Sequence, residues 1–189
     1  MTVAAINPAV QPAAAREPKE VLETVLGRER ARVGLIDYAK FVDDVYEPYA
    51  VHRYIARKLE AVEAGLLRRL AIFVPPAVGK SRIASEIFPT WVMGRNPNFE
   101  IIEASYNKDK AAEFGGVSRD IIKSDAYKIL FPKTQISTTA AAADAWKTTT
   151  GGSYKASGTA GGIIGFHAHI AIIDDPFKNY AEAASLQNR

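Results

Sequence analysis

The spacing of apolar residues divides the chain into a helical first third and a remainder in which strands and helices alternate. In the first third, apolar residues recur at helical spacing in three segments, which we expect to be helices: 19–32, 34–42 and about 49–64. Farther along, short apolar runs rich in β-branched residues predict three strands: about 69–74, 100–106 and 169–176. Gly65 is expected to end the third helix and Pro176 the third strand.

Helices are expected between these strands. Apolar positions predict one over residues 81–93, with a kink or an early end at Pro89, and another over 108–124, interrupted at Gly115. Residues 133–166 are rich in Thr, Ala and Gly and too long for a plain loop, so we expect a hairpin within them. The order strand–helix–strand–helix–strand predicts an α/β fold, with a mostly parallel sheet flanked by helices on both faces.

The junction between the first strand and its helix has the composition of a phosphate-binding loop. Backbone N–H groups at such a turn and at the helix N-terminus can surround phosphate oxygens. The residues expected to bind the phosphates are Pro76, Ala77, Val78, Gly79, Lys80 and Ser81. Lys80 would reach the β- and γ-phosphates, and the Ser81 hydroxyl would bind Mg²⁺. Val74 stands where the common pattern has a glycine, so the motif alone also fits a turn with a surface lysine.

A second set of candidate residues ends the third predicted strand. A P-loop nucleotide hydrolase needs an acidic residue at the end of a neighbouring strand to hold Mg²⁺. Asp174 is predicted to take this role opposite Ser81, and Asp175 is predicted to polarise the attacking water. Two solvated aspartates after a core strand are the simpler interpretation. The combination with an upstream phosphate loop favours a shared nucleotide site.

Composition excludes some classes of protein but does not by itself indicate a function. The chain has 189 residues, no cysteine and a net charge of +3, which is too small to indicate nucleic-acid binding by itself. It has no run of 18 apolar residues and no signal-peptide pattern, so neither a membrane span nor secretion is predicted. We expect a disordered leader over residues 1–18, a helical segment over 19–66 and a P-loop ATPase core over 67–189.

Beyond these patterns, the chain resembles the N-terminal ATPase domain of the large terminase subunit of tailed bacteriophages, from about residue 20 to the end. In that family Pro-Pro stands where other phosphate loops have their first glycine, which accounts for Val74. The segments that carry the resemblance are Leu35-Ile36-Asp37-Tyr38-Ala39-Lys40-Phe41, Tyr46-Glu47-Pro48, His52, Arg69-Leu70-Ala71-Ile72-Phe73-Val74-Pro75-Pro76, Gly79-Lys80-Ser81, Phe88-Pro89-Thr90-Trp91, Gly94-Arg95-Asn96-Pro97, Ile102-Glu103-Ala104-Ser105-Tyr106, Phe114-Gly115, Arg119, Leu130-Phe131-Pro132, Trp146, Gly151-Gly152, Gly165 and Ile172-Ile173-Asp174-Asp175-Pro176.

The resemblance implies a P-loop ATPase of the additional-strand type, with ATP and Mg²⁺ as cofactors and Lys80 and Asp175 as catalytic residues. It implies double-stranded DNA as the translocated partner, the phage portal and the small terminase subunit as further partners, assembly into a homo-oligomeric ring, and action in the cytoplasm of a bacterial host. A full large subunit also carries a C-terminal nuclease domain, so the resemblance implies that this chain is truncated.

One position departs from the family pattern. The family commonly has an arginine in the loop where this chain has Ala77, and an arginine that reaches the γ-phosphate can raise the rate by a factor of about 10³–10⁵. Arg119, or an arginine from a neighbouring subunit, could replace it. We therefore keep two alternatives open: another nucleic-acid motor of the helicase kind, and a truncated nucleotide-binding domain without turnover.

Overall fold

The computed structural model describes residues 17–159, 165–178 and 184. The three helices expected in the first third are confirmed: α1 (Pro18–Val33), α2 (Leu35–Val42) and α3 (Ala50–Glu63). Gly65 follows α3 with a φ of 72°, as expected of a glycine that ends a helix. The predicted leader lies outside the described residues except for its last two positions, and of these Pro18 begins α1.

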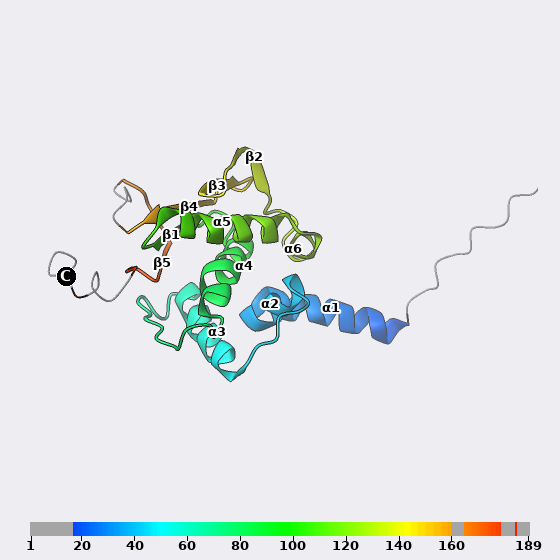
Figure 1. The fold of residues 1–189 in the computed structure, drawn as a ribbon. Helices are drawn as coiled ribbons and strands as arrows, with labels where there is room; N and C mark the ends of the chain where they lie inside the picture. Colours follow the sequence, from blue (N-terminus) through cyan, green and yellow to red (C-terminus); the bar gives the residue numbers. More distant parts are fainter. Residues whose placement is uncertain (1–16, 160–164, 179–183, 185–189) are drawn as a thin grey trace, which may run out of the picture.

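A five-stranded sheet forms the other part of the molecule (Figure 1). Its strands are β1 (Glu100–Ser105), β2 (Ile136–Ala141), β3 (Ala145–Thr148), β4 (Ser153–Gly158) and β5 (Ile170–Asp174), in the order β2-β3-β4-β1-β5. The strands predicted at 100–106 and 169–176 are therefore confirmed.

The sheet is mixed, which corrects the expectation of a mostly parallel one. β1 pairs in parallel with both β4 and β5, whereas β2, β3 and β4 pair antiparallel. The reason lies in residues 133–166, which supply an antiparallel meander instead of a single hairpin. Its second turn, between β3 and β4, contains Gly151 with a φ of 98°, whereas the turn expected at Gly161 lies outside the described residues.

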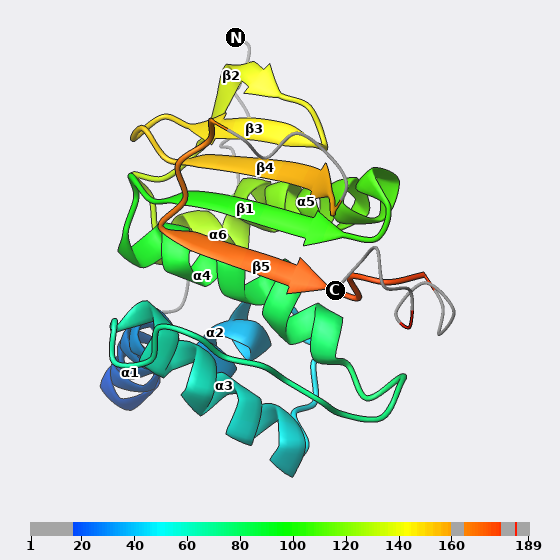
Figure 2. The same cartoon turned by 90° about the vertical axis from the view of Figure 1, so that its left-hand side faces the viewer.

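Helices of the second part pack behind one face of the sheet: η1 (Arg82–Ile87, a π-helix), α4 (Phe88–Arg95), α5 (Lys108–Lys123) and α6 (Asp125–Leu130) (Figure 2). In the part of the chain that the structure describes, no helix covers the opposite face, so helices on both faces are not found. Pro89 is the second residue of α4, directly after the π-helical turns of η1, and the helical run does not end there but continues to Arg95.

The expected interruption of α5 at Gly115 is also wrong, because the helix runs through it. A Cβ on Gly115 would lie 2.4 Å from the Ala143 carbonyl oxygen and 2.6 Å from the Tyr154 ring. The glycine therefore serves the close approach of α5 to the sheet rather than a break in the helix.

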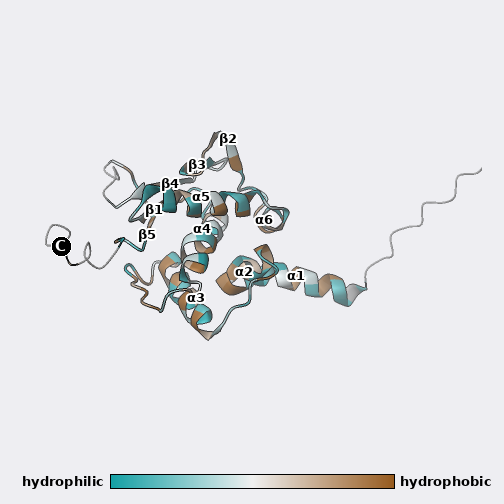
Figure 3. Ribbon diagram, in the orientation of Figure 1, coloured by the Kyte–Doolittle hydropathy of each residue, from teal (hydrophilic) through white to brown (hydrophobic). Residues whose placement is uncertain are grey.

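The strand predicted at residues 69–74 is not present. This apolar segment, brown beside α3 in Figure 3, is extended, but it pairs with no described strand, and its amide and carbonyl groups make no main-chain hydrogen bond within the described residues. In Figure 2 it runs below β5 in the direction of the β5 arrow. A cleft of about 500 Å³ separates it from β5, whose outer edge is also unpaired and whose Ile173 is 64% exposed. The apolar pattern predicted the extended backbone correctly, but pairing also depends on a neighbour at strand spacing.

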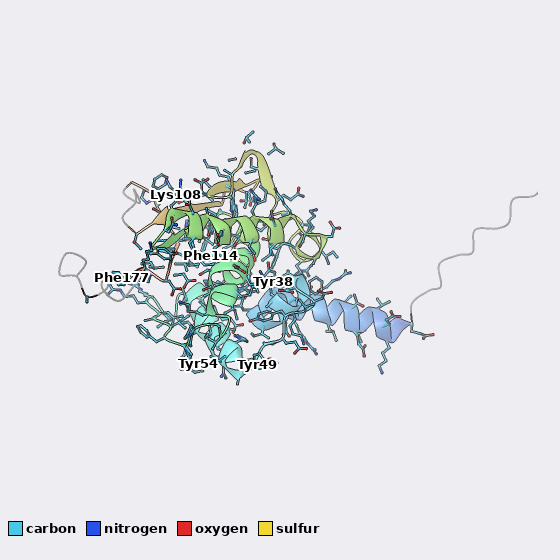
Figure 4. The ribbon with its side chains drawn as sticks, viewed as in Figure 1. Tyr38, Tyr49, Tyr54, Lys108, Phe114 and Phe177 are labelled. Atoms are coloured by element: carbon cyan, nitrogen blue, oxygen red, sulfur yellow. The ribbon has the colours of Figure 1, made fainter. Side chains whose placement is uncertain are left out.

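Buried aromatic residues join the two parts and fix α5 on the sheet. Tyr38 lies between α2 and α4 (Figure 4), and its hydroxyl is 2.7 Å from the Thr90 hydroxyl. Beneath α5, Trp146 and Tyr154 stack with ring centroids 4.9 Å apart, and the Trp146 indole donates a hydrogen bond to the Gly115 carbonyl oxygen. None of the described helices is long and apolar enough to cross a membrane.

Candidate functional site

The predicted phosphate loop is a tight turn that leads directly into a helical run. Ala77 and Gly79 both have positive φ, at 62° and 82°, and helical structure begins at Lys80 and continues through η1 into α4. Where right- and left-handed backbone conformations alternate, successive N–H groups point to one side and form a concave anion-binding surface. The loop lines a cleft of about 440 Å³, together with Asp175.

His52 of α3 supports this loop from behind. Its Nδ1 accepts a hydrogen bond of 3.0 Å from the Tyr49 amide, so its Nε2 carries the proton and donates to the Val78 carbonyl oxygen at 2.5 Å. The ring is buried, and a Cβ on Gly79 would lie 3.0 Å from Nε2. The helical first third of the chain therefore fixes the position of the phosphate loop.

The two predicted carboxylates meet the loop lysine. Lys80 Nζ lies 2.7 Å from Asp174 Oδ1 and 2.8 Å from Asp175 Oδ1. The Asp174 side chain is only 5% exposed, whereas that of Asp175 is 69% exposed. Asp174 ends β5 and Asp175 follows with a φ of 45°, so the turn aims the two side chains differently. The structure thus brings together the residues that the sequence placed 94 positions apart.

The electrostatics of this group favour a charged lysine. Burial opposes the charge, but hydrogen bonds and attraction from Asp174 and Asp175 outweigh it and raise the pKa of Lys80. Ser85, one turn farther along the helix than Ser81, donates a hydrogen bond of 3.3 Å to Asp174 Oδ2. Asp174 is therefore held by a cation on one oxygen and by a hydroxyl on the other.

A third carboxyl group lies behind the site in the middle of the sheet. Glu103 of β1 is 0% exposed, and neither of its oxygens has a hydrogen-bond partner within the described residues. Burial raises the pKa of Glu103 to about 9. The nearby Ser85 hydroxyl lowers this pKa, whereas the charges of Asp174 and Glu86 raise it further. Glu103 is consequently neutral at pH 7, and it adds no charge beside Asp174.

The donor set suits a magnesium ion that is also bound by phosphates. Magnesium prefers oxygen ligands, and in nucleotide sites it takes only one or two from the protein. Ser81 and Asp174 both line a second, smaller pocket beside the loop cleft, and no cluster of three metal-binding side chains occurs among the described residues. The Ser81 hydroxyl and the Asp174 carboxylate are thus the groups that could hold the ion.

Arg119, considered as a substitute at the loop, and Arg82, which follows the loop directly, are both engaged elsewhere. Arg119 donates to the Ala141 carbonyl oxygen at 2.8 Å and pairs with Asp120, on the α5 face toward β2. Arg82 pairs with Asp43 at 2.5 Å and with Glu86 at 2.7 Å. Neither guanidinium is directed at the carboxylate pair in this structure.

Sequence reasoning assigned no role to three residues that shape the site. His52 entered only through the family resemblance, and nothing in its neighbourhood indicated a contact with a loop 26 residues away. Ser85 had a usable signal, because it follows Ser81 at helical spacing. Glu103 had one as well, since it is an acidic residue in the interior of a strand with apolar residues on both sides.

Comparison with known proteins assigns the chain to a family. No curated protein and no solved structure matches it. A family model described as the N-terminal part of the terminase large subunit, T4-like virus type, matches residues 72–189, which include the phosphate loop, all five strands and the carboxylate pair. This match covers more than half of the chain, and it agrees with the resemblance seen in the sequence. The chain belongs to the family of terminase large-subunit N-terminal domains of the T4-like type.

Proposed function

We propose that this chain binds ATP with Mg²⁺ in the loop cleft and hydrolyses it, as the ATPase part of a motor that packages phage DNA. The observation that carries the proposal is the bridge from Lys80 to Asp174 and Asp175 at the mouth of a loop with two positive-φ residues. The loop backbone, a cation and two carboxylates lie together there, which supports the proposal of a nucleotide site.

Binding would exchange the partners of Lys80. In the structure its ammonium group compensates the two carboxylates. A triphosphate in the loop cleft would draw Lys80 to its β- and γ-phosphates, since the loop amides and Lys80 together favour an anion there. Asp174 and the Ser81 hydroxyl would then hold Mg²⁺, which supplies charge neutralisation on the phosphates.

Asp175 is the residue proposed to orient water. It is the more exposed of the two carboxylates, and it faces both the loop cleft and the smaller pocket beside it. A carboxylate at this point can accept a hydrogen bond from a water molecule that approaches the terminal phosphate. Asp174 is better suited to hold a cation, because it is buried and each of its oxygens has a partner, Lys80 or Ser85.

The partners are proposed from the family. A terminase large subunit of this family would act on double-stranded DNA in the host cytoplasm, together with the portal, the small subunit and further copies of itself in a ring. The matched family disfavours the helicase alternative. The second candidate, a nucleotide-binding domain without turnover, is favoured by Ala77 in the loop and by the engagement of Arg82 and Arg119 elsewhere.

The test compares nucleotide binding and turnover in wild type, Lys80→Ala and the control Lys123→Ala, which removes an exposed lysine at the end of α5. Calorimetry should show Mg·ATP binding by wild type and by the control, and an affinity at least tenfold lower for Lys80→Ala. Equal affinity in all three proteins would refute the site. Binding without phosphate release, at high protein concentration and with added DNA, would support the second candidate.

A further inference from the structure

A side pocket of about 240 Å³ adjoins the loop cleft at the carboxyl ends of β1 and β5. The two spaces share Ser81 and Asp175 in their walls, so the pocket begins where the loop cleft ends. Its far side is formed by α5, from which Phe114 projects toward α4 (Figure 4). Ser81 and Asp174, proposed above to hold Mg²⁺, belong to its wall, whereas Ser105 and Phe114 have no role in that binding.

Ser105, the last residue of β1, is a polar group of this pocket that has no partner. It is 1% exposed, and its hydroxyl makes no hydrogen bond within the described residues. It pairs in register with Asp174 of β5, so the two side chains stand side by side on one face of the sheet. A buried hydroxyl without a partner is unfavourable, and such groups are found where a water or a ligand completes them.

The charge of the pocket indicates what completes it. Its wall carries three carboxylates, from Glu86, Asp174 and Asp175, and one lysine, Lys110, which already pairs with Glu113 at 2.7 Å. These carboxylates are paired with Lys80 and Arg82, and the Ser105 hydroxyl is left without a partner among the described residues. Water suits both kinds of group, because it can donate to carboxylates and accept from a hydroxyl. The volume is sufficient for ordered water.

We propose that this pocket holds the water that attacks the terminal phosphate, and that the Ser105 hydroxyl binds that water and orients it. This inference rests on the proposed function, since it places the triphosphate in the loop cleft. Ser105 would donate one hydrogen bond to the water oxygen, and Asp175 would accept one from a water hydrogen. The remaining lone pair of the water oxygen would then face the γ-phosphorus across Ser81.

The bonds in this step balance without any further reactant. The water oxygen forms a bond to the γ-phosphorus while the bond from that phosphorus to the bridging oxygen breaks. The electron pair of the broken bond stays on the bridging oxygen, which becomes a terminal oxygen of ADP. One water proton leaves by way of Asp175 to solvent or to the inorganic phosphate formed. Ser105 keeps its own proton and acts only by binding the water.

The test compares Ser105→Ala with Ser157→Ala. Ser157 is a matched control, because it is buried near the end of the neighbouring strand β4, does not line the pocket and donates its own hydrogen bond to the Gly158 carbonyl oxygen. We expect kcat to fall about tenfold in Ser105→Ala, the loss that corresponds to one neutral hydrogen bond, with the KM and Kd for Mg·ATP within twofold of wild type. Ser157→Ala should retain the wild-type kcat, and Ser105→Thr, which keeps the hydroxyl, should retain most of it.

A binding measurement makes the test independent of turnover. Mg·ADP·aluminium fluoride mimics the in-line transition state together with its water, whereas Mg·ADP alone does not. Ser105→Ala should bind the former about tenfold more weakly than wild type and the latter equally well. It should also melt at the same temperature as wild type or higher, because it removes an unpartnered buried group.

Unchanged kcat and unchanged affinity for aluminium fluoride in Ser105→Ala would overturn this inference while leaving the proposed function intact. A wild-type protein that binds no Mg·ATP would overturn both. If Ser105→Ala does not fold, Ser105→Cys takes its place, and wild-type affinity of that variant for Mg·ADP·aluminium fluoride would count against the role of the hydroxyl.

Discussion

Replacing Glu103 with glutamine is expected to make the protein more stable at neutral and alkaline pH. Glu103 is fully buried in the centre of the sheet without a hydrogen-bond partner among the described residues, and its pKa is raised from 4.5 to about 9, mainly by burial. In the unfolded chain the same carboxyl group ionises near 4.5. Between these two values the folded protein retains a proton that the unfolded chain has lost.

The sign and size of the effect follow from this difference. Because the folded state binds one more proton at Glu103, the contribution of this group to stability is highest below pH 4.5 and falls as the pH rises to about 9. The slope is at most about 1.4 kcal/mol per pH unit, so wild type should lose about 4 kcal/mol relative to a neutral replacement between pH 5.5 and 8.5. Glu103→Gln keeps the shape of the side chain and removes this dependence.

Urea unfolding, followed by the fluorescence of the buried Trp91 and Trp146, measures the free energy of unfolding at pH 5.5, 7 and 8.5. The difference between Glu103→Gln and wild type should widen steadily with pH. Glu23→Gln, which removes an exposed carboxylate on α1, is the control and should follow wild type. Parallel pH profiles for wild type and Glu103→Gln would refute the reasoning, because they would mean that Glu103 ionises equally in both states.

Four further substitutions test the site and the packing around it. Lys80→Ala should lower the free energy of unfolding, measured in urea, by about 1–2 kcal/mol, because Asp174 is left buried without its cation. The loss is smaller than for a fully buried pair, since Lys80 is partly exposed. His52→Ala should weaken Mg·ATP binding about fivefold in calorimetry without abolishing it, because the loop loses its hydrogen bond at Val78. Gly115→Ala should destabilise by about 2 kcal/mol or more through its clash with the Ala143 carbonyl oxygen, and a melting temperature unchanged from wild type would contradict the close approach. Gly116→Ala, whose Cβ would only touch Ala143 at 3.8 Å, should instead stabilise by about 0.5–1 kcal/mol.

The sequence predicted most of the local structure because local structure depends on spacing. The three N-terminal helices and the strands β1 and β5 follow from the periodicity of their apolar residues. The predictions failed where the local structure depends on residues distant in the sequence. The segment 69–74 has the composition of a strand but no neighbour at pairing distance. Gly115 was predicted to interrupt a helix, but it lies inside one, at the point where the helix approaches β4 closely. No pattern within either segment contains that information.

The candidate site divides in the same way. Lys80, Asp174 and Asp175 could be predicted, because a phosphate loop and an acidic strand end each have a recognisable local form, and parallel strands bring such ends together. Ser105 could not, because its importance depends on its register with Asp174 and on the pocket that α5 closes. Ser105 and His52, unlike Ser85 with its helical spacing from Ser81, carry no signal until the fold determines their neighbours.

The two unpaired edges along the cleft affect how the loop and the carboxylates can move. Within the described residues, no main-chain hydrogen bond joins segment 69–74 to β5, and the polar links between the loop's side of the cleft and the end of β5 are made by side chains. Two of these links are the ion pairs of Lys80. A phosphate that draws Lys80 away would remove both ion pairs at once, and the Ser85–Asp174 hydrogen bond and the proposed Mg²⁺ contact of Ser81 and Asp174 would then join the two sides. Occupancy of the loop would in this way change the partners of the β5 carboxylates through side chains alone, without breaking a main-chain hydrogen bond of the sheet.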